Sequence, residues 1–152
     1  MGLFKKEKQI GKIIREKLES FGGKALMPML RGESVAFWIS STGKGIETGK
    51  LPNYILEWEH FDEIVKEANW LGGRMYRGDA QAQGGKRLGE GIPYDCMEGF
   101  IASELLYEQK GVSVTRRSTY YSGILAWAGI VALHRSQGKG SFITVNAMYR
   151  DR

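Results

Sequence analysis

One stretch, from Thr115 to Val145, constrains the fold more than any other part of the chain. Apolar residues recur in its first part at spacings of three and four, at Tyr121, Ile124, Leu125 and Ala128. This spacing predicts a helix with one apolar face. Gly129 follows where a helix commonly ends, because glycine adopts the left-handed conformation at little cost.

The rest of this stretch has the composition of a β-hairpin. Residues 130–135 and 142–145 are rich in β-branched and apolar side chains, and Gln137-Gly138-Lys139-Gly140 joins them. The two glycines supply the positive φ angles that a tight turn needs. The sequence therefore predicts a helix followed directly by a hairpin.

Polar and basic residues occupy the start of the expected helix, where the chain reads Arg116-Arg117-Ser118-Thr119-Tyr120. Thr115 or Ser118 can act as the N-cap by accepting a hydrogen bond from a free backbone N–H. Cations at this end oppose the helix dipole, at a cost of up to about 1 kcal/mol, which an anionic partner would offset. The arrangement therefore favours contact with phosphate.

The segment RRSTYYSGILAWAGIVALHRSQGKG, residues 116–140, resembles the second half of a winged-helix DNA-binding domain. It is also similar to the accessory winged-helix module that precedes some bacterial restriction nucleases. The likeness rests on the polar helix start, the Trp-Ala-Gly helix end and the glycine-containing hairpin. It implies a winged-helix-like subdomain over 93–148, with a support helix over 93–109. In that arrangement residues 112–114 are the short strand that pairs with the wing.

The support helix has its own start signal. Asp95 can cap it, and Glu98 stands three residues later in the capping-box position. Glycine pairs separate the elements that precede it. The segment 73–91 is glycine-rich and carries several basic residues, and it is expected to be a long loop.

The first part of the chain should combine helices with a small sheet. A basic amphipathic helix is expected over 3–21, within a basic segment 1–24. Strands are expected over 34–41 and 46–48, and a helix over 59–71.

Pro28 interrupts any regular element over 25–32. We therefore predict one α+β domain over residues 1–152, with a small antiparallel sheet, an N-terminal helix and a C-terminal winged-helix-like half.

Charge is distributed unevenly along the chain, whose formal net charge is +5. Residues 1–24 and 110–152 carry an excess of lysine and arginine, whereas residues 25–109 carry an excess of acids. Basic ends favour a polyanionic partner, and we predict non-enzymatic binding of DNA, chiefly duplex. Arginine suits this role because it donates two parallel hydrogen bonds to guanine or phosphate. The predicted contacts lie at the helix start, on the hairpin and in the glycine-rich segment: Arg116, Arg117, Ser118, Thr119, Tyr120, Arg135, Lys139, Arg74, Arg77, Lys86 and Arg87.

Two other functions are weighed against DNA binding. A winged-helix fold can also bind proteins, and an exposed apolar patch should then replace the positive one. An enzyme acting on nucleic acid would have His60, Glu63 and Cys96 as its only candidate residues. Neither an H-E-x-x-H spacing nor a cysteine pair exists, so we expect no metal, no cofactor and no catalytic set.

The remaining expectations concern assembly and location. A single cysteine excludes an internal disulfide and favours a reducing, cytoplasmic compartment. No apolar run approaches the roughly 20 residues that a membrane-spanning helix needs. A basic amphipathic first helix would support a homodimer, which would present two half-sites to DNA.

Overall fold

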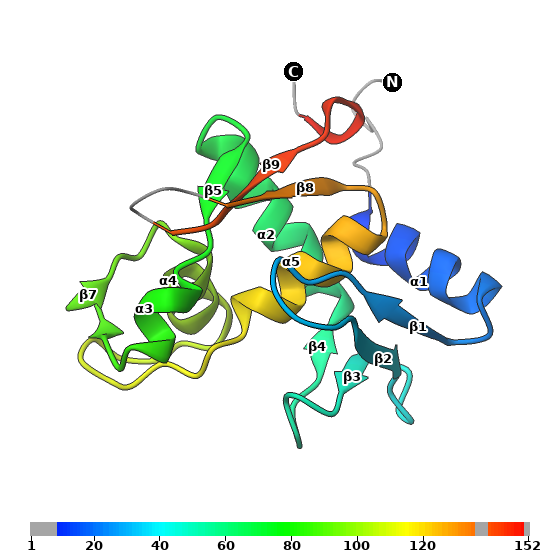
Figure 1. Ribbon diagram of the computed structural model, residues 1–152, viewed down its shortest axis with the longest axis horizontal. Coiled ribbons are helices and arrows are strands. Elements are labelled where there is room, and N and C mark those ends of the chain that lie inside the picture. The colour runs from blue at the N-terminus through cyan, green and yellow to red at the C-terminus, as the bar shows by residue number, and fades with distance from the viewer. Residues whose placement is uncertain (1–8, 136–139, 151–152) are drawn as a thin grey trace.

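Helix α5 (Ser118–Trp127) runs through the centre of the molecule, with a β-sheet on each side of it (Figure 1). The computed structural model describes residues 9–135 and 140–150. The described chain contains both helices and strands, and both sheets that contact α5 are antiparallel. The predicted α+β class is therefore confirmed.

The first sheet has four strands in sequential order. They are β1 (Lys24–Met27), β2 (Val35–Ile39), β3 (Gly45–Thr48) and β4 (Leu56–Glu57). The two strands expected over 34–41 and 46–48 correspond to β2 and β3. Strand β1 was not expected, because Pro28 was taken to disrupt the whole segment. The strand instead ends one residue before that proline, so the missing N–H breaks no ladder bond.

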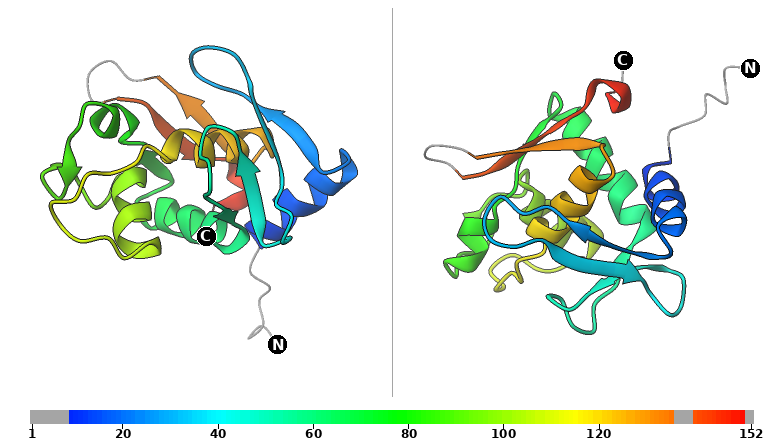
Figure 2. Two further views of the ribbon diagram at one scale, coloured as in Figure 1. Left: turned by 90° about the horizontal axis from the view of Figure 1, so that it is seen from below. Right: turned by 45° about the vertical axis from the view of Figure 1, so that its right-hand side comes forward.

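Two helices pack together beside this sheet. They are α1 (Ile10–Ser20) and α2 (Trp58–Trp70), and the right-hand view of Figure 2 shows α1 at the edge of the molecule. The Asp62 carboxylate of α2 accepts hydrogen bonds from the backbone N–H groups of Ile10 and Gly11, which caps α1. Residues 3–8 of the expected first helix lie outside the described residues.

The second sheet contains the predicted hairpin. Its strands are β5 (Arg74–Tyr76), β8 (Val131–His134) and β9 (Phe142–Val145), in the order β5-β9-β8. Gly129 ends α5 with φ at +79°, as predicted. Residues 137–139 of the predicted turn lie outside the described residues.

The third strand of this sheet is not the one that the winged-helix resemblance implied. Strand β5 pairs with β9, whereas the Val112 carbonyl accepts a hydrogen bond from the backbone N–H of Leu88. The positive φ angles of Gly72 and Gly73 turn the chain from the end of α2 straight into β5. The prediction that residues 112–114 pair with the wing is therefore wrong.

The segment expected to be a long loop is mostly ordered structure. After β5 it holds α3 (Asp79–Gln83), β6 (Arg87–Leu88) and β7 (Gly91–Ile92). These elements lie together at the left of Figure 1. Leu88 and Ile92 are fully buried and belong to a small second hydrophobic cluster, which explains why the segment folds back on itself.

The expected support helix is shorter than predicted. It consists of α4 (Met97–Phe100) continued by a π-helical turn (Ile101–Leu105). The last described element is a separate, short 3₁₀-helix (Ala147–Tyr149), which follows β9. The Cys96 sulfur, not Asp95, caps α4 by accepting a hydrogen bond from the Gly99 backbone N–H at 3.4 Å. Tyr107 has φ at +57°, which takes the chain out of helical geometry before Gln109.

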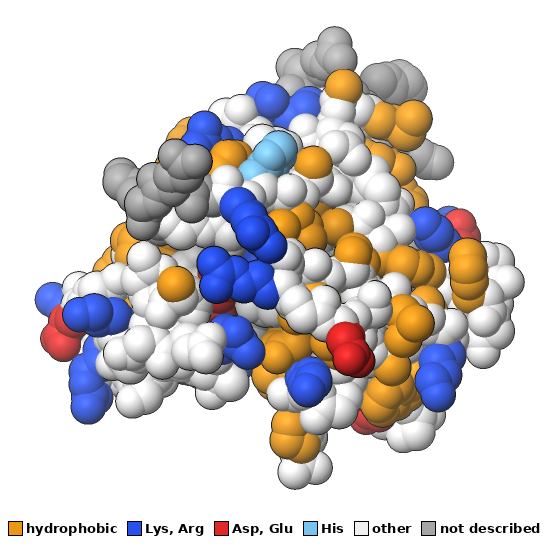
Figure 3. All heavy atoms as spheres, in the orientation of Figure 1, with side chains coloured by type: hydrophobic (Ala, Val, Ile, Leu, Met, Phe, Trp, Pro, Cys, Tyr) orange, Lys and Arg blue, Asp and Glu red, His pale blue; other side chains and the backbone are white. Residues whose placement is uncertain are grey.

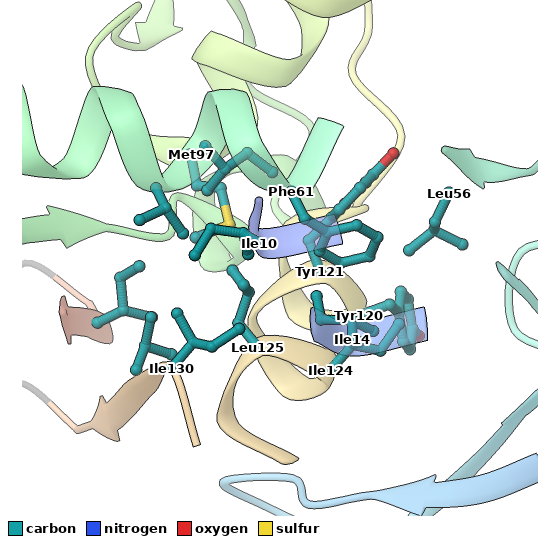
Figure 4. Close-up of a cluster of buried hydrophobic side chains, with 14 of the residues drawn as sticks. Ile10, Ile14, Leu56, Phe61, Met97, Tyr120, Tyr121, Ile124, Leu125 and Ile130 are labelled. Carbon is teal, nitrogen blue, oxygen red and sulfur yellow. The ribbon is translucent and has the colours of Figure 1, made fainter. Parts of the chain in front are cut away.

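One large hydrophobic cluster joins α1, α2, α5 and both antiparallel sheets. Figure 4 shows Tyr121 of α5 among Phe61, Ile14 and Leu56, and the Phe61 and Tyr121 ring centroids are 5.1 Å apart.

Among the described helices, none is long and apolar enough to cross a membrane.

Candidate nucleic-acid interface

The start of α5 is buried, contrary to what a helix that reads DNA requires. The exposed fractions of Ser118, Thr119 and Tyr120 are 0%, 4% and 5%. Every residue from Ser118 to Leu125 is buried, because β1 packs on one side of the helix and β8 on the other. The prediction that these three side chains contact a nucleic acid is therefore wrong.

A carboxylate from another element holds this helix start in place. Glu98 of α4, which is fully buried, accepts hydrogen bonds from the backbone N–H groups of Arg117 and Ser118 at 3.0 and 2.9 Å. It also accepts one from the Ser118 hydroxyl at 2.6 Å. Glu98 therefore caps α5, and neither the expected N-cap by Thr115 or Ser118 nor the expected capping box with Asp95 forms.

Burial decides the protonation of this carboxyl group. Desolvation raises the pKa of Glu98 from 4.5 to about 7, although the hydrogen bonds from Ser118 and Arg117 act in the opposite direction. A carboxyl group at a helix N-terminus is well placed to interact with the helix dipole. Glu98 thus occupies the position in which a phosphate was expected.

Two of the predicted arginines are also engaged inside the protein. The Arg117 guanidinium donates to the Glu108 carboxylate at 3.1 Å and lies over the Tyr54 ring. Arg77 is only 4% exposed and forms an ion pair with Asp79 at 2.6 Å. Both guanidinium groups are therefore held in ion pairs within the fold, although Arg77 Nε and Arg117 Nη1 are buried without a hydrogen-bond partner among the described residues. These ion pairs correct the assignment of the two arginines as contacts.

The other predicted cations remain on the surface. Arg74, Lys86, Arg87 and Arg135 are exposed, and Arg116 is half-buried. Lys139 lies outside the described residues. Arg135 donates to the Leu30 carbonyl at 2.7 Å, which fixes the end of β8 against the loop after β1. Figure 3 shows lysine and arginine side chains gathered in the middle of one face, over the start of α5.

A row of aromatic and basic side chains lies on the outer face of the second sheet, the face turned away from α5. The paired positions Tyr76, Phe142 and His134 share this face, while Met75 and Ile143 between them point into the core. The Phe142 ring is stacked on the His134 ring, with centroids 4.7 Å apart and an angle of 8° between the planes. The Arg74 guanidinium carbon lies over the same ring at 3.9 Å.

The order of the strands explains how this column forms. Strand β9 lies between β5 and β8, so Arg74 and His134 approach the Phe142 ring from opposite sides. A hydrogen bond between His134 Nε2 and the Thr144 hydroxyl, 2.8 Å long, fixes the imidazole. We name Arg74, Phe142 and His134 the cation–aromatic column.

Sequence reasoning found Arg74 and missed the other members of this column. Phe142 and His134 were counted only as apolar or extended residues of the hairpin. The available signal was the period of two in the strand, because Phe142 and Thr144 alternate with the buried Ile143 and Val145. Their pairing with Arg74 depended on β5, which the sequence pattern did not reveal.

The residues considered for an enzyme do not converge. Cys96 is buried, and desolvation raises the pKa of its thiol to about 11, which opposes a nucleophilic role. His60 Nδ1 forms a hydrogen bond with the Tyr121 hydroxyl at 2.9 Å, and burial lowers the pKa of this histidine. Glu63 lies in a separate groove between α2 and the π-helical turn.

Within residues 9–135 and 140–150, no group of three or more His, Cys, Asp or Glu side chains could hold a metal ion. Comparison with protein-family models, with curated proteins and with solved structures finds no match to this chain. The functional assignment therefore rests on the geometry of the chain itself.

Proposed function

We propose that this chain is a non-enzymatic nucleic-acid-binding protein whose contact surface is the outer face of the β5-β9-β8 sheet. The cation–aromatic column is the observation that carries the proposal. It places a guanidinium and two aromatic rings side by side on an exposed sheet, and cations and aromatic faces are the groups that bind phosphates and bases.

The surrounding charge supports the same surface. Arg135 follows β8 directly, and the formal net charge of the chain is +5. Exposed arginines bind phosphate by releasing counterions, so affinity should fall as salt rises. The hairpin contributes to this interface in place of the helix start, so the contact predicted for the wing is retained in the proposal.

Titration of a fluorescent oligonucleotide at about 50 and 200 mM salt tests this proposal. The double variant Arg74→Ala with Arg135→Ala should bind at least tenfold more weakly, and its salt slope should fall by roughly one to two units. Lys44→Ala with Lys50→Ala is the matched control, because these exposed lysines flank strand β3 on the other sheet. If both double variants lowered the affinity for the oligonucleotide equally, net charge alone would explain the loss and the proposed surface would be refuted.

Homodimerisation and an intracellular location belong to this proposal as further predictions. The apolar face of α1 does not support pairing between copies, because Ile10, Ile14 and Leu18 are buried within the chain. A dimer would therefore have to form through another surface. Sedimentation measurements with and without the oligonucleotide would decide between a monomer and a dimer.

Protein binding is the second candidate function, and one residue favours it. Trp70 at the end of α2 is 83% exposed and lines a groove shared with Leu105 and the acids Glu67 and Glu104. An exposed tryptophan beside carboxylates suits a basic partner. Trp70→Ala should leave oligonucleotide binding unchanged if the sheet face is the nucleic-acid surface.

A further inference from the structure

We infer that the ligand of the outer sheet face is single-stranded nucleic acid, whose bases extend the cation–aromatic column at its two ends. This inference rests on the proposed function and names its substrate class. The column is a stack of three flat groups, Arg74, Phe142 and His134, held on three adjacent strands. Bases in a single strand are free to join such a stack, whereas bases in a duplex are already stacked on each other.

The position of α5 prevents this helix from reading a DNA duplex. Helix α5 follows the basic residues that suggested groove reading, but it is enclosed by elements on both sides. Its N-terminal N–H groups are occupied by Glu98. The N-terminus of α5 therefore cannot enter a major groove, although this is how proteins that bind DNA through a helix reach the base edges.

A nucleic-acid base would stack on an end of the cation–aromatic column. Both faces of the Phe142 ring are covered, by the Arg74 guanidinium on one side and the His134 ring on the other. The surfaces left for stacking are the outer sides of those two groups. Arg74 is exposed, and both guanidinium planes and imidazole rings are known stacking partners of RNA and DNA bases.

Hydrogen bonds hold both ends of the column in place. Arg74 also donates to the Tyr76 hydroxyl at 3.1 Å, and His134 is bonded to Thr144. Both ends are therefore oriented before any ligand arrives, which lowers the ordering cost of binding. A phosphate backbone running along the sheet would meet the charge of Arg74 on this face, while Arg135, which is held against the Leu30 carbonyl, adds positive charge at the end of β8.

The decisive variants distinguish the contribution of positive charge to binding from the contribution of stacking by planar side chains. Arg74→Lys keeps the positive charge but removes the planar group that stacks. Phe142→Leu keeps apolar volume on the sheet but removes the ring on which the column is built. A purely electrostatic site would tolerate the arginine-to-lysine change, whereas a stacking site would not.

The experiment compares a fluorescent oligo-dT of about 12 nucleotides with a mixed-sequence duplex of similar length. The unmodified protein should bind the single strand at least tenfold more tightly. Arg74→Lys and Phe142→Leu should each weaken single-strand binding about fivefold or more, the loss expected for one stacked base. Duplex binding should change by less than about twofold, since its phosphate contacts keep their charges.

Two results would overturn the inference in distinguishable ways. Equal affinity for both ligands, with Arg74→Lys indistinguishable from the unmodified protein, would exclude stacking while leaving nucleic-acid binding intact. Absence of binding to either ligand at low salt would exclude the proposed function as well. Far-UV circular dichroism of each variant identifies a folding defect, and the exposed Arg74 position keeps the test valid if Phe142→Leu does not fold.

Discussion

Removal of the Glu98 carboxyl group should destabilise the fold more than its position in a four-residue helix suggests. Glu98 accepts hydrogen bonds from two backbone N–H groups and one hydroxyl at the start of α5. In Glu98→Ala these buried donors lose their acceptor, and each unsatisfied group costs about 1–3 kcal/mol. We expect Glu98→Ala to lower the free energy of unfolding by about 3–5 kcal/mol at pH 5, a large part of the total stability of a domain.

Glu98→Gln provides the matched comparison. One carboxylate oxygen, Oε2, accepts from Arg117, from the Ser118 N–H and from the Ser118 hydroxyl, whereas Oε1 accepts only from Arg117. A glutamine that places its oxygen at the Oε2 position keeps three of these hydrogen bonds. Its side-chain NH₂ group then faces the Arg117 N–H, and these two donors cannot form a hydrogen bond with each other. The loss should therefore be only about 1 kcal/mol.

Urea unfolding followed by circular dichroism measures both variants, with Glu90→Ala as an exposed control. The expected order of stability is the unmodified protein and the control together, then Glu98→Gln, then Glu98→Ala. If Glu98→Ala lost less than about 1 kcal/mol, the buried carboxyl group would not be what holds the start of α5 in place.

Two further measurements follow from the same structure. Because folding raises the pKa of Glu98 from 4.5 to about 7, the protonated Glu98 carboxyl group contributes most to the free energy of unfolding below pH 4.5. This contribution is lost as the pH rises through 7. The stability of the unmodified protein relative to Glu98→Gln should therefore fall by about 3 kcal/mol between pH 4.5 and pH 8, so that Glu98→Gln becomes the more stable protein at pH 8, as urea midpoints at each pH would show. Gly11→Ala should cost about 1–3 kcal/mol, because its Cβ would lie 2.4 Å from the Trp58 carbonyl oxygen. Thermal unfolding beside an exposed control, Lys12→Ala, would measure that cost, and an unchanged melting temperature would contradict the close packing of α1 on α2.

Local patterns predicted the elements whose signals lie within one segment. The boundary at Gly129 and the hairpin after it depend on backbone freedom and on β-branched residues, which the sequence displays directly. Strand β2 was found from its apolar run, and helix α2 from the helical spacing of its apolar residues, which are also local signals. Strand β5 was missed because three residues between a helix and a turn carry too little pattern to identify a strand without its partner.

Burial of α5 could not be read from its sequence. Ser118, Thr119 and Ser122 look like a solvated face, yet each is buried with a hydrogen-bond partner supplied inside the fold. Gly123 adds to the effect, because a Cβ there would lie 2.8 Å from the Met27 sulfur. The missing side chain of Gly123 thus allows β1 to approach the helix closely. That closeness depends on tertiary contacts, which spacing alone does not encode.

The buried carboxyl group also explains why the sequence pointed to phosphate at the wrong place. A helix N-terminus attracts anions, and two arginines beside it strengthen that expectation. Here the acceptor comes from the protein: the Glu98 carboxyl group satisfies the free N–H groups, while Glu108 pairs with Arg117. The chemistry inferred from the residues was sound, but its partner lies twenty residues earlier in the same chain. A polyanionic ligand must then bind where cations keep an open side, and Arg74 on the outer sheet face meets that condition.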